Sequence, residues 1–328
     1  MKLAVLGGGS WGTALCAHLA RSGHGVRLWL RKPAIARDIN ERRENAVYLP
    51  GVALPAGMEA TTDLGDAVAG VETVFVVIPS GFCRAIYREL RSFVPPGAIL
   101  VSATKGIETD TLSRMTQVAE AEVPRHPLAV VSGPSFAVEV AQGQPTTVVV
   151  AATDLAVAES VQRVLSSRTF RAYSSDDVVG VEVAGALKNV IAIAAGIIDG
   201  LGYGHNTGAA LITRGLAEMT RLAVALGGRA DTLSGLAGLG DLVLTCTGAL
   251  SRNRRVGQAL GSGQTLVQAT TGTNMVAEGV RTTIAACALA DRTGIEMPIA
   301  RQMNAVLYHG QPPRDAVDEL MLRSLKRE

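Results

Sequence analysis

The sequence predicts an α/β fold in which an N-terminal doubly wound, mainly parallel sheet is followed by an all-helical C-terminal domain. Up to about residue 173, short β-branched runs alternate with longer amphipathic stretches, which is typical of βαβ units. After residue 176 the strand-like runs stop, and long Ala-, Leu- and Ile-rich segments follow. The chain has 328 residues, enough for about two domains. We therefore expect domains at 1–175 and 176–328, divided where the periodicity changes.

The N-terminal half contains eight runs with strand character. They cover residues 2–6, 26–30, 58–61, 73–78, 98–102, 128–132, 146–151 and 169–173. Helical patterns lie between most of them, for example at 82–93 and 155–165. In the C-terminal half the predicted helices cover 178–198, 209–226, 252–260, 276–292 and 298–308. Several of these end at glycines such as Gly227, Gly228 and Gly310, as helices commonly do.

Composition and charge exclude several classes of protein. The chain carries 31 Lys and Arg against 29 Asp and Glu, a net charge of +2, so no bulk charge favours nucleic acid or an anionic membrane. A mean hydropathy of +0.26 disfavours intrinsic disorder. The four cysteines and five histidines form no close clusters, which disfavours a disulfide framework and a metal site.

No segment of the sequence reads as a signal peptide or a membrane span. Residues 2–6 are apolar, but the three glycines that follow end the run too early for a signal peptide, so a strand is expected. The most membrane-like segment, 189–198, is shorter than the roughly 20 apolar residues that a spanning helix needs. We expect a soluble, cytoplasmic protein.

A glycine loop directly follows the first predicted strand. Gly7, Gly9 and Gly12 fit the pattern G-x-G-x-x-G, and a helical pattern begins at Thr13. In Rossmann-like domains such glycines allow a tight turn and a close backbone approach to a pyrophosphate at a helix N-terminus. A glycine-rich turn without a ligand is the alternative. The order of strand, loop, helix and strand favours a dinucleotide site.

The second predicted strand ends in two cations, Arg31 and Lys32, about 20 residues after the loop. An enzyme specific for NAD usually places a carboxylate there to bind the ribose 2′-hydroxyl. Two cations favour a 2′-phosphate instead, so we expect NADPH to be preferred and NADH to be possible. The alternative is that both side chains lie in water at the end of a strand.

Polar residues follow two more predicted strands, where a doubly wound sheet exposes its ligand crevice. Lys105 comes after the strand at 98–102, and Ser135 comes after the strand at 128–132. Both are expected to face the cofactor, although an exposed loop lysine is an equal alternative for Lys105.

Lys188 lies in a predicted helix that is apolar on almost every face, so we expect it to be buried. Burial disfavours the charged amine and lowers its pKa, as a general acid or base near neutral pH requires. The alternatives are a lysine that extends to the rim of the domain or one that pairs with Glu182.

Two segments of the C-terminal half indicate a ligand site. The glycine-rich stretch 235–242 contains Asp241, which is suited to orienting a lysine ammonium or a substrate hydroxyl. Ser251 is predicted to be a helix N-cap, followed by Arg252 and Asn253. Cations at a helix start oppose the helix dipole unless an anion binds there, so this predicts a phosphate site; a solvated basic helix start is the alternative. Glu278 is read from the residues only as a carboxylate that stabilises another helix start.

Seven segments together resemble bacterial-type NAD(P)-dependent glycerol-3-phosphate dehydrogenases, and the resemblance covers essentially the whole chain. They are Gly7–Leu15 (GGGSWGTAL), Thr104–Glu108 (TKGIE), Ser132–Ala137 (SGPSFA), Gly185–Val190 (GALKNV), Leu211–Gly215 (LITRG), Gly238–Leu242 (GLGDL) and Ser251–Asn253 (SRN). The resemblance implies reversible reduction of dihydroxyacetone phosphate to sn-glycerol 3-phosphate, a precursor of glycerophospholipids, by a homodimer.

The resemblance also implies roles for single residues. Lys188 matches the family's proton acceptor, and the residues that match substrate contacts are Lys105, Gly133, Ser135, Lys188, Asp241, Ser251, Arg252 and Asn253. Besides the glycines of the loop, the residues that match cofactor contacts are Ser10, Trp11, Arg31, Lys32, Lys105, Ala137, Arg252, Val276 and Glu278. The sequence departs from the family at Gly208, where a Lys or Arg is common.

Two other functions remain open from the sequence. An NADP-dependent β-hydroxyacid dehydrogenase or ketoacid reductase shares the α/β plus helical layout and uses a lysine on a helix. A non-catalytic NADPH-binding protein would also retain the glycine loop. The basic helix start at Ser251 favours a phosphorylated substrate, and Lys188 in its apolar helix argues against a silent binding protein.

Overall fold

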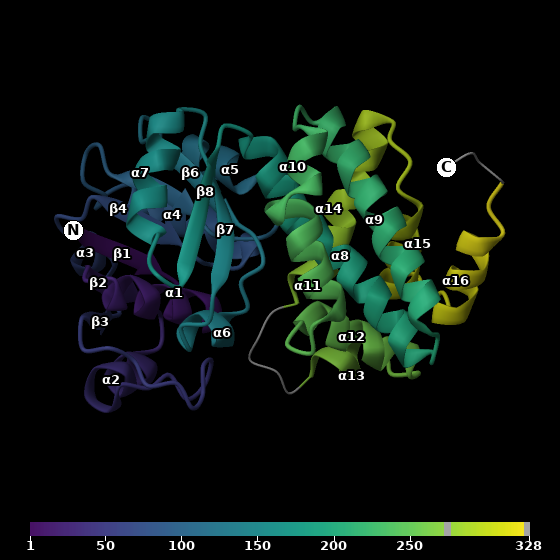
Figure 1. Cartoon of the computed structure of the whole chain (residues 1–328), viewed down its shortest axis with the longest axis horizontal. Coiled ribbons are helices and arrows are strands. Elements are labelled where there is room, and N and C mark those ends of the chain that lie inside the picture. Colours follow the sequence, from purple (N-terminus) through teal and green to yellow (C-terminus); the bar gives the residue numbers. More distant parts are fainter. Residues whose placement is uncertain (272–276, 325–328) are drawn as a thin grey trace.

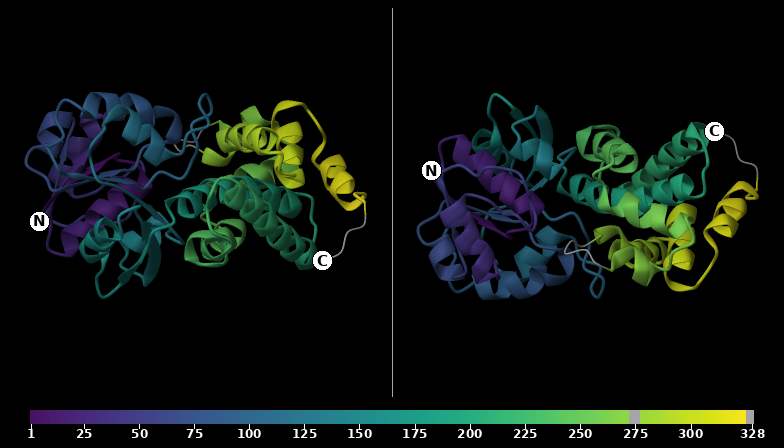
Figure 2. Two further views of the ribbon diagram at one scale, coloured as in Figure 1. Left: turned by 90° about the horizontal axis from the view of Figure 1, so that it is seen from above. Right: turned by 90° about the horizontal axis from the view of Figure 1, so that it is seen from below.

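The computed structural model describes residues 1–271 and 277–324, which form a sheet half and a helical half lying side by side (Figures 1 and 2). The sheet half holds an eight-stranded sheet in the order β3-β2-β1-β4-β5-β6-β7-β8. The strands are β1 (Lys2–Leu6), β2 (Gly25–Trp29), β3 (Met58–Thr61), β4 (Thr73–Val76), β5 (Ile99–Ser102), β6 (Leu128–Ser132), β7 (Thr146–Ala151) and β8 (Phe170–Ser175). All neighbouring pairs are parallel except β6 and β7. The predicted doubly wound, mainly parallel sheet is therefore confirmed.

Helices cover both faces of this sheet. One face packs against α1 (Ser10–Arg21), α2 (Pro33–Arg42), α6 (Ala137–Ala141) and α7 (Leu155–Leu165). The other face packs against α3 (Leu64–Val68), α4 (Ser80–Leu90) and α5 (Met115–Glu122). The strand β1 shows why: Leu3 and Val5 enter the first core, whereas Ala4 and Leu6 enter the second. Side chains alternate between the faces of a strand, so a strand buried on both sides is apolar throughout.

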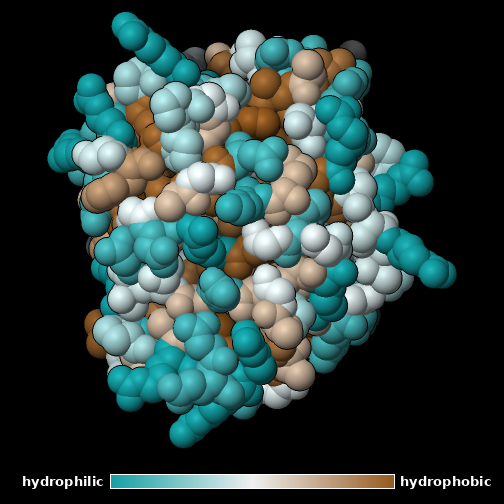
Figure 3. All heavy atoms as spheres, turned by 90° about the vertical axis from the view of Figure 1, so that its left-hand side faces the viewer, coloured by the Kyte–Doolittle hydropathy of each residue, from teal (hydrophilic) through white to brown (hydrophobic). Residues whose placement is uncertain are grey.

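The strand order reverses between β1 and β4, which defines the switch point of the sheet. In open α/β sheets ligands bind outside the carboxyl ends of the strands at this point. The loop after β1 and the loop after β4 therefore border the crevice. Away from the helical half, the surface of the sheet half is mostly hydrophilic, with apolar atoms in small separate areas (Figure 3).

The helical half is arranged around α8 (Val178–Gly200), which runs through its centre (Figure 1). Around it lie α9 (His205–Ala225), α10 (Ala230–Ser234), the π-helical turn η1 (Leu236–Gly240), α11 (Asp241–Thr247), α12 (Arg252–Gly261), α13 (Leu266–Thr270), α14 (Glu278–Thr293), α15 (Pro298–Tyr308) and α16 (Pro313–Met321). Every residue of α8 from Gly180 to Ile198 is buried. The helix is apolar all round because it is covered all round.

The length of the apolar segment was underestimated from the sequence. The structure extends it to the 23 residues of α8, which is long and apolar enough to cross a membrane. Its most apolar window is nevertheless wholly buried inside the protein, so α8 is here the core helix of the helical half.

The long predicted helices agree with the structure within a few residues, and the ranges 155–165 and 298–308 agree at both ends. Residues 276–292 were expected in one helix, but α14 begins at Glu278. The glycine-rich segment before Asp241, for which the sequence predicted no element, is the turn η1 leading directly into α11.

Candidate active site

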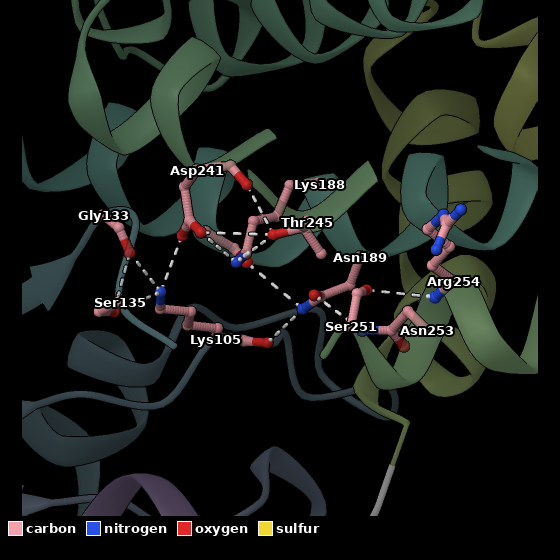
Figure 4. Close-up of polar contacts among 11 residues, drawn as sticks. Lys105, Gly133, Ser135, Lys188, Asn189, Asp241, Thr245, Ser251, Asn253 and Arg254 are labelled. Carbon is pink, nitrogen blue, oxygen red and sulfur yellow. Dashed lines mark hydrogen bonds and ion pairs between the residues drawn. The ribbon is translucent and has the colours of Figure 1, made fainter. Parts of the chain in front are cut away.

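Lys188 is buried in the middle of α8, with 6% of the residue exposed, as the sequence predicted. Its Nζ donates to Asp241 Oδ1 at 2.5 Å and to Thr245 Oγ1 at 2.8 Å (Figure 4). The alternative that Lys188 pairs with Glu182 is wrong. Both carboxylate oxygens of Glu182 accept hydrogen bonds from Thr116, and one of them also accepts from Arg114. An ammonium has three N–H groups. Two of them are used here, which leaves one for a ligand.

Asp241 joins two lysines. It is the first residue of α11 and is 1% exposed. Its Oδ2 accepts from Lys105 Nζ at 2.7 Å, while its Oδ1 accepts from Lys188. Thr245, one helical turn further on, donates its hydroxyl to the backbone carbonyl of Asp241 at 2.6 Å. Asp241 is thereby held by its own helix and by both amines.

The turn η1 packs closely against the backbone of Leu233, and Asp241 follows directly after it in its buried position. A Cβ on Gly238 would lie 2.0 Å from the carbonyl oxygen of Leu233, so only glycine allows this approach. The glycine-rich sequence before Asp241 therefore has a packing reason as well as the ligand reason inferred from the sequence.

The electrostatics of the cluster favour proton exchange near neutral pH. The pKa of Lys188 is lowered to about 8: burial is the largest cause, Asp241 acts in the opposite direction, and the nearby charge of Lys105 acts in the same direction as burial. Burial alone would raise the pKa of Asp241, but the two ammonium groups hold it below its ordinary value. The carboxylate thus stays ionised, while the amine of Lys188 can be populated in both protonation states.

Lys105 connects the cluster to the edge of the sheet. It lies in the loop between β5 and α5, and its Nζ donates to the carbonyl oxygen of Gly133 at 2.8 Å. The hydroxyl of Ser135 lies 3.4 Å from the same Nζ and donates to the same carbonyl. Gly133 has a φ of +141°, a conformation that requires glycine. Lys105, Gly133, Ser135 and Asp241, all expected site residues, therefore meet in one place (Figure 4).

Ser251 caps α12, as predicted, by accepting from the backbone N–H of Arg254. Arg252 reaches across to the sheet half, where its Nη2 donates to Ser10 Oγ at 2.7 Å. The side chain of Asn253 is used within the protein, because its Nδ2 donates to Asn189 Oδ1 and its Oδ1 accepts from the N–H of Gly279. Among these residues Arg252 is the one whose charge faces the crevice beside the glycine loop.

The loop after β1 has the geometry that a dinucleotide needs. Gly7 has a φ of +125°, and a Cβ on Gly12 would lie 1.8 Å from the carbonyl oxygen of Gly7. A Cβ on Gly9 would meet nothing within 4 Å, so this side of the loop is open. No side chain caps α1. The first N–H groups of a helix have no partner within the helix, so the N-terminus of α1 is suited to a pyrophosphate.

An unsatisfied donor supports the same assignment. Trp11 Nε1 is buried and has no hydrogen-bond partner among the residues that the structure describes. A buried donor without a partner costs free energy, and a ligand would provide an acceptor. The residues present therefore fit a bound dinucleotide.

Arg31 and Lys32 both lie at the surface beside this crevice. The guanidinium of Arg31 lies over the ring of Phe82, 5.3 Å from its centre, and Lys32 Nζ lies 5.7 Å from the centre of the Tyr48 ring. Within residues 1–271 and 277–324 neither cation forms an ion pair with a carboxylate. Both charges therefore remain available to a phosphate.

Three further expected cofactor residues lie at different places. Ala137 begins α6, directly after the loop that holds Ser135. Glu278 begins α14, but its carboxylate does more than stabilise its own helix: it accepts from Ser80 N at 3.1 Å and from Ser80 Oγ at 2.7 Å, and so caps α4 of the sheet half. Val276 lies outside the described residues.

Sequence reasoning missed three residues of the site: Thr245, Asn189 and Ser80. Thr245 stands four residues after Asp241 on an apolar helix, a spacing that places both on one face and was an available signal. Asn189 donates to the carbonyl oxygen of Lys105 at 3.2 Å. No local pattern distinguishes Ser80, because its partner Glu278 is 198 residues away.

The arrangement can bind a nucleotide at the switch point and present a buried amine, a second lysine and an arginine beside it. Two amines share one carboxylate, so the cluster has a net positive charge and suits an anionic substrate. The amine of Lys188 can donate or accept one proton at such a substrate.

The chain is similar to known proteins over nearly its whole length. Residues 2–158 match the family model for the N-terminus of NAD-dependent glycerol-3-phosphate dehydrogenase, and residues 177–318 match the model for its C-terminus. The chain is 54% identical over 332 residues to glycerol-3-phosphate dehydrogenase [NAD(P)+] of Nitratidesulfovibrio vulgaris (strain DP4), covering all of both proteins. It is 52% identical over 330 residues to the protein of that name from Geobacter sp. (strain M21), covering 100% of this chain and 98% of the relative. Among solved structures, glycerol-3-phosphate dehydrogenase from Coxiella burnetii matches with a TM-score of 0.95 and 41% identity, over 98% of this chain and 99% of that one.

Proposed function

Because the chain belongs to the family of NAD(P)-dependent glycerol-3-phosphate dehydrogenases, we propose that its reaction takes place at the cluster of Lys188, Asp241 and Lys105. The enzyme interconverts dihydroxyacetone phosphate and sn-glycerol 3-phosphate with NAD(P)H. One observation carries the assignment of the site: Lys188 is a buried amine held between Asp241 and Thr245, with a pKa near 8. Family membership also separates this function from the ketoacid reductase and silent binding protein left open above.

Lys188 exchanges the proton of the reaction. When bound, the reduced nicotinamide supplies the hydride that adds to C2 of dihydroxyacetone phosphate. The ammonium of Lys188 donates a proton to the oxygen on C2, and in the reverse direction the neutral amine accepts the proton of the hydroxyl. Asp241 and Thr245 fix two N–H directions of Lys188, so its third N–H is the one that points to substrate.

Arg252 and the N-terminus of α12 hold the phosphate of the substrate. A helix start with N–H donors and a guanidinium is a good binding site for a dianion. In the described structure Arg252 is bonded to Ser10 of the glycine loop, which supports a position for its charge between the two proposed ligand sites. Lys105 adds a second positive charge on the side of Gly133 and Ser135.

The glycine loop, the N-terminus of α1 and Trp11 would hold the dinucleotide. We propose that NADPH is preferred and NADH is also accepted, because Arg31 and Lys32 offer two charges without carboxylate partners at the end of β2. A 2′-phosphate gains charge-assisted hydrogen bonds there that a hydroxyl cannot form.

Several broader properties are also part of the proposal. The family resemblance and the absence of bulk charge support a cytoplasmic enzyme without membrane or nucleic-acid partners that supplies glycerophospholipid synthesis. The same resemblance supports a homodimer. The junction of β8 and α8, between Ser175 and Val178, supports a division into a dinucleotide-binding domain at 1–175 and a helical catalytic domain at 176–328.

The test measures the decay of NADPH absorbance with dihydroxyacetone phosphate as the substrate. The assay is then repeated with NADH as the cofactor, and with a 2-ketoacid as the substrate. We expect turnover with the phosphorylated ketone and little with the ketoacid.

Lys188→Ala should lower kcat about 100-fold or more, since a positioned acid contributes that much, with NADPH binding retained. Arg252→Ala should raise KM for dihydroxyacetone phosphate. Unchanged kcat in the first variant or unchanged KM in the second would contradict the corresponding role.

A further inference from the structure

The segment that carries Lys105 follows a strand of the sheet but packs into the helical half. We call residues 103–114, between β5 and α5, the Lys105 loop. Ile107 is 2% exposed and belongs to the core of the helical half, and Leu112 packs against the same core. The neighbouring Thr104 donates its hydroxyl to the carbonyl oxygen of Ile78 at 2.7 Å, so the position of Lys105 depends on contacts with the helical half as well as with the sheet half.

Glu182 of α8 holds the far end of this loop. Its Oε1 accepts from Thr116 N at 2.8 Å, and its Oε2 accepts from Thr116 Oγ1 at 2.6 Å and from Arg114 Nη1 at 2.5 Å. Arg114 is the N-cap residue of α5, so Glu182 caps this helix from the other half of the molecule. The carboxylate is buried, with 6% of the residue exposed, and a buried carboxylate is costly unless it has partners of this kind.

A short backbone pairing connects Arg114 to the lysine. Ile107 and Arg114 form an antiparallel bridge, and Glu108 N donates to Ser113 O at 3.0 Å. Lys105 stands two residues before Ile107. The bonds of Glu182 thus fix one arm of a small hairpin, and the other arm leads directly to Lys105.

The residues of α8 that contact the Lys105 loop lie in one row along the helix. Glu182, Gly185 and Asn189 are spaced by three and four residues and so share one side of the helix. A Cβ on Gly185 would lie 3.7 Å from Cγ of Lys105 and 2.6 Å from Ser132 Oγ, so the glycine makes room there. Asn189 donates to the carbonyl oxygen of Lys105 (Figure 4). Lys188 adjoins this row.

We propose that Glu182 is a positioning residue of the reaction: it fixes the Lys105 loop on α8, so that Lys105 reaches Asp241 and the carboxylate is shared by both lysines. This inference rests on the proposed function for its kinetic consequence, but the anchoring itself is a property of the fold.

The anchoring affects Lys188 through charge. Lys105 lowers the pKa of Lys188, and it also binds one oxygen of Asp241. If the loop moves away, Lys188 loses a neighbouring positive charge and gains a larger share of the carboxylate. Both changes raise the pKa of Lys188, so the pH midpoint of the reduction should move upward. A loss of stability alone would not move this midpoint.

The experiment compares Glu182→Gln with wild type and with Glu108→Gln. Glu108 lies on the same loop, but its carboxylate accepts from Arg84 of α4 in the sheet half and from Thr111 of the loop itself, so the comparison separates anchoring on α8 from the loop's other carboxylate contacts. In Glu182→Gln we expect kcat/KM for dihydroxyacetone phosphate to fall about 10-fold, as for a modest misplacement of a site group. We expect the pH midpoint to rise, KM for NADPH to change less than twofold, and amide exchange in the loop to become about tenfold faster.

Thr116→Val removes one hydroxyl donor to Glu182 and serves if Glu182→Gln does not fold; we expect a smaller change in the same direction. Glu182→Asp should restore part of the loss. Amide hydrogen exchange in the ligand-free protein tests the anchoring independently of the reaction. If the exchange rates of the Lys105 loop are the same in Glu182→Gln as in wild type, the proposal is overturned, even if wild type fails to reduce dihydroxyacetone phosphate. Where wild type is active, two further results overturn the proposal. One is an unchanged kcat/KM and pH midpoint in both Glu182→Gln and Thr116→Val. The other is a midpoint shift in Glu108→Gln equal to that in Glu182→Gln.

Discussion

At the scale of single residues, the site depends on a shortage of negative charge. Two buried or partly buried lysines share the carboxylate of Asp241. An anionic substrate beside this cluster would supply the missing negative charge, so we expect the cluster to gain favourable electrostatic energy when the substrate binds. A buried pair that was already neutral would gain less from an anion.

The pH dependence of the reaction tests this arrangement. With the pKa of Lys188 near 8, reduction should decline above about pH 8 because the ammonium is lost, whereas oxidation of glycerol 3-phosphate should increase.

In Asp241→Asn the positive charge of Lys188 loses its partner, so the midpoint should move below that of wild type. The unfolding free energy at pH 7 should fall by about 3 kcal/mol, because two amines lose their carboxylate. A pH–rate profile and urea denaturation measure both effects; an unchanged midpoint would contradict the pairing.

How much of the site could be predicted depended on whether a residue conflicts with its local sequence. Lys188 conflicts with its apolar helix, and Arg252 conflicts with the dipole of α12, so both could be recognised from the sequence. Ser80 conflicts with nothing near it in the chain, and the conflict of Glu182 with its apolar helix does not identify its partners. The roles of both residues come from partners 198 and 66 residues away, and no local pattern contains such pairings.

At the scale of elements, a glycine contact between α8 and α12 sets the distance between Lys188 and the start of α12, the proposed phosphate site. A Cβ on Gly257 would lie 2.0 Å from the carbonyl oxygen of Ile193, and a Cβ on Gly196 would lie 1.9 Å from that of Arg254. The two helix backbones touch at these points. Ser251 and Arg252, at the start of α12, are thereby fixed relative to Lys188.

Substituting one of these glycines should separate the helices. We expect Gly257→Ala to lower the unfolding free energy by about 3 kcal/mol, as for overpacking in a core, and to reduce kcat/KM for dihydroxyacetone phosphate. The control is Gly208→Ala on α9, where a Cβ meets nothing within 4 Å. That variant should be stabilised by about 0.5–1 kcal/mol with unchanged activity, because alanine has less freedom to lose on folding. Equal stability of the two variants would contradict the contact.

The start of α15 depends on Glu218 of α9, which accepts from the backbone N–H groups of Ile299 and Ala300. Burial raises the pKa of Glu218 to about 7, although both N–H groups act in the other direction. Between about pH 4.5 and 7 the folded protein therefore binds this proton more tightly than the unfolded chain. The unfolding free energy should fall by about 3 kcal/mol as pH rises through this window.

Glu218→Gln should remove this part of the pH dependence. Urea denaturation at pH 5 and pH 8 should show a smaller difference in the variant than in wild type. Glu41→Gln, at an exposed position of α2, is the control and should keep the slope of wild type. A variant of Glu218 with the wild-type slope would show that the group titrates at an ordinary pKa.

The long elements were predictable because their periodicity extends over many residues, as in α7 and α15. The short helices α3, α6, α10 and α13, of five residues each, offer too few turns for a pattern. The turn η1 could not be predicted because glycine disfavours helices in isolation; here packing against Leu233 selects the conformation.

At the scale of the whole molecule, polar contacts between the halves surround the cofactor crevice. Glu278 of the helical half caps α4 at the loop after β4, and Arg252 bonds to Ser10 at the loop after β1. These are the two loops that border the switch point. We therefore expect binding of the nucleotide to involve both halves at once.

Glu278→Ala should weaken NADPH binding, because the N-terminus of α4 loses its cap at the rim of the crevice. We expect Kd for NADPH, measured by fluorescence titration, to rise about fivefold to tenfold, in line with about 1 kcal/mol for a helix cap. At saturating NADPH, kcat should stay within twofold of wild type. Ser80→Ala, which keeps the backbone N–H, should show a smaller effect; wild-type affinity in Glu278→Ala would contradict this account.

The insertion of Ile107 and Leu112 into the helical core has a consequence for chimeric enzymes. A cut at residue 175 looks natural, but a hybrid joined there would combine one parent's hairpin with a cavity shaped by the other parent. Such hybrids should fold poorly unless residues 103–114 are exchanged together with the C-terminal portion. In evolutionary terms, this stretch of the first portion is expected to diverge in step with the second.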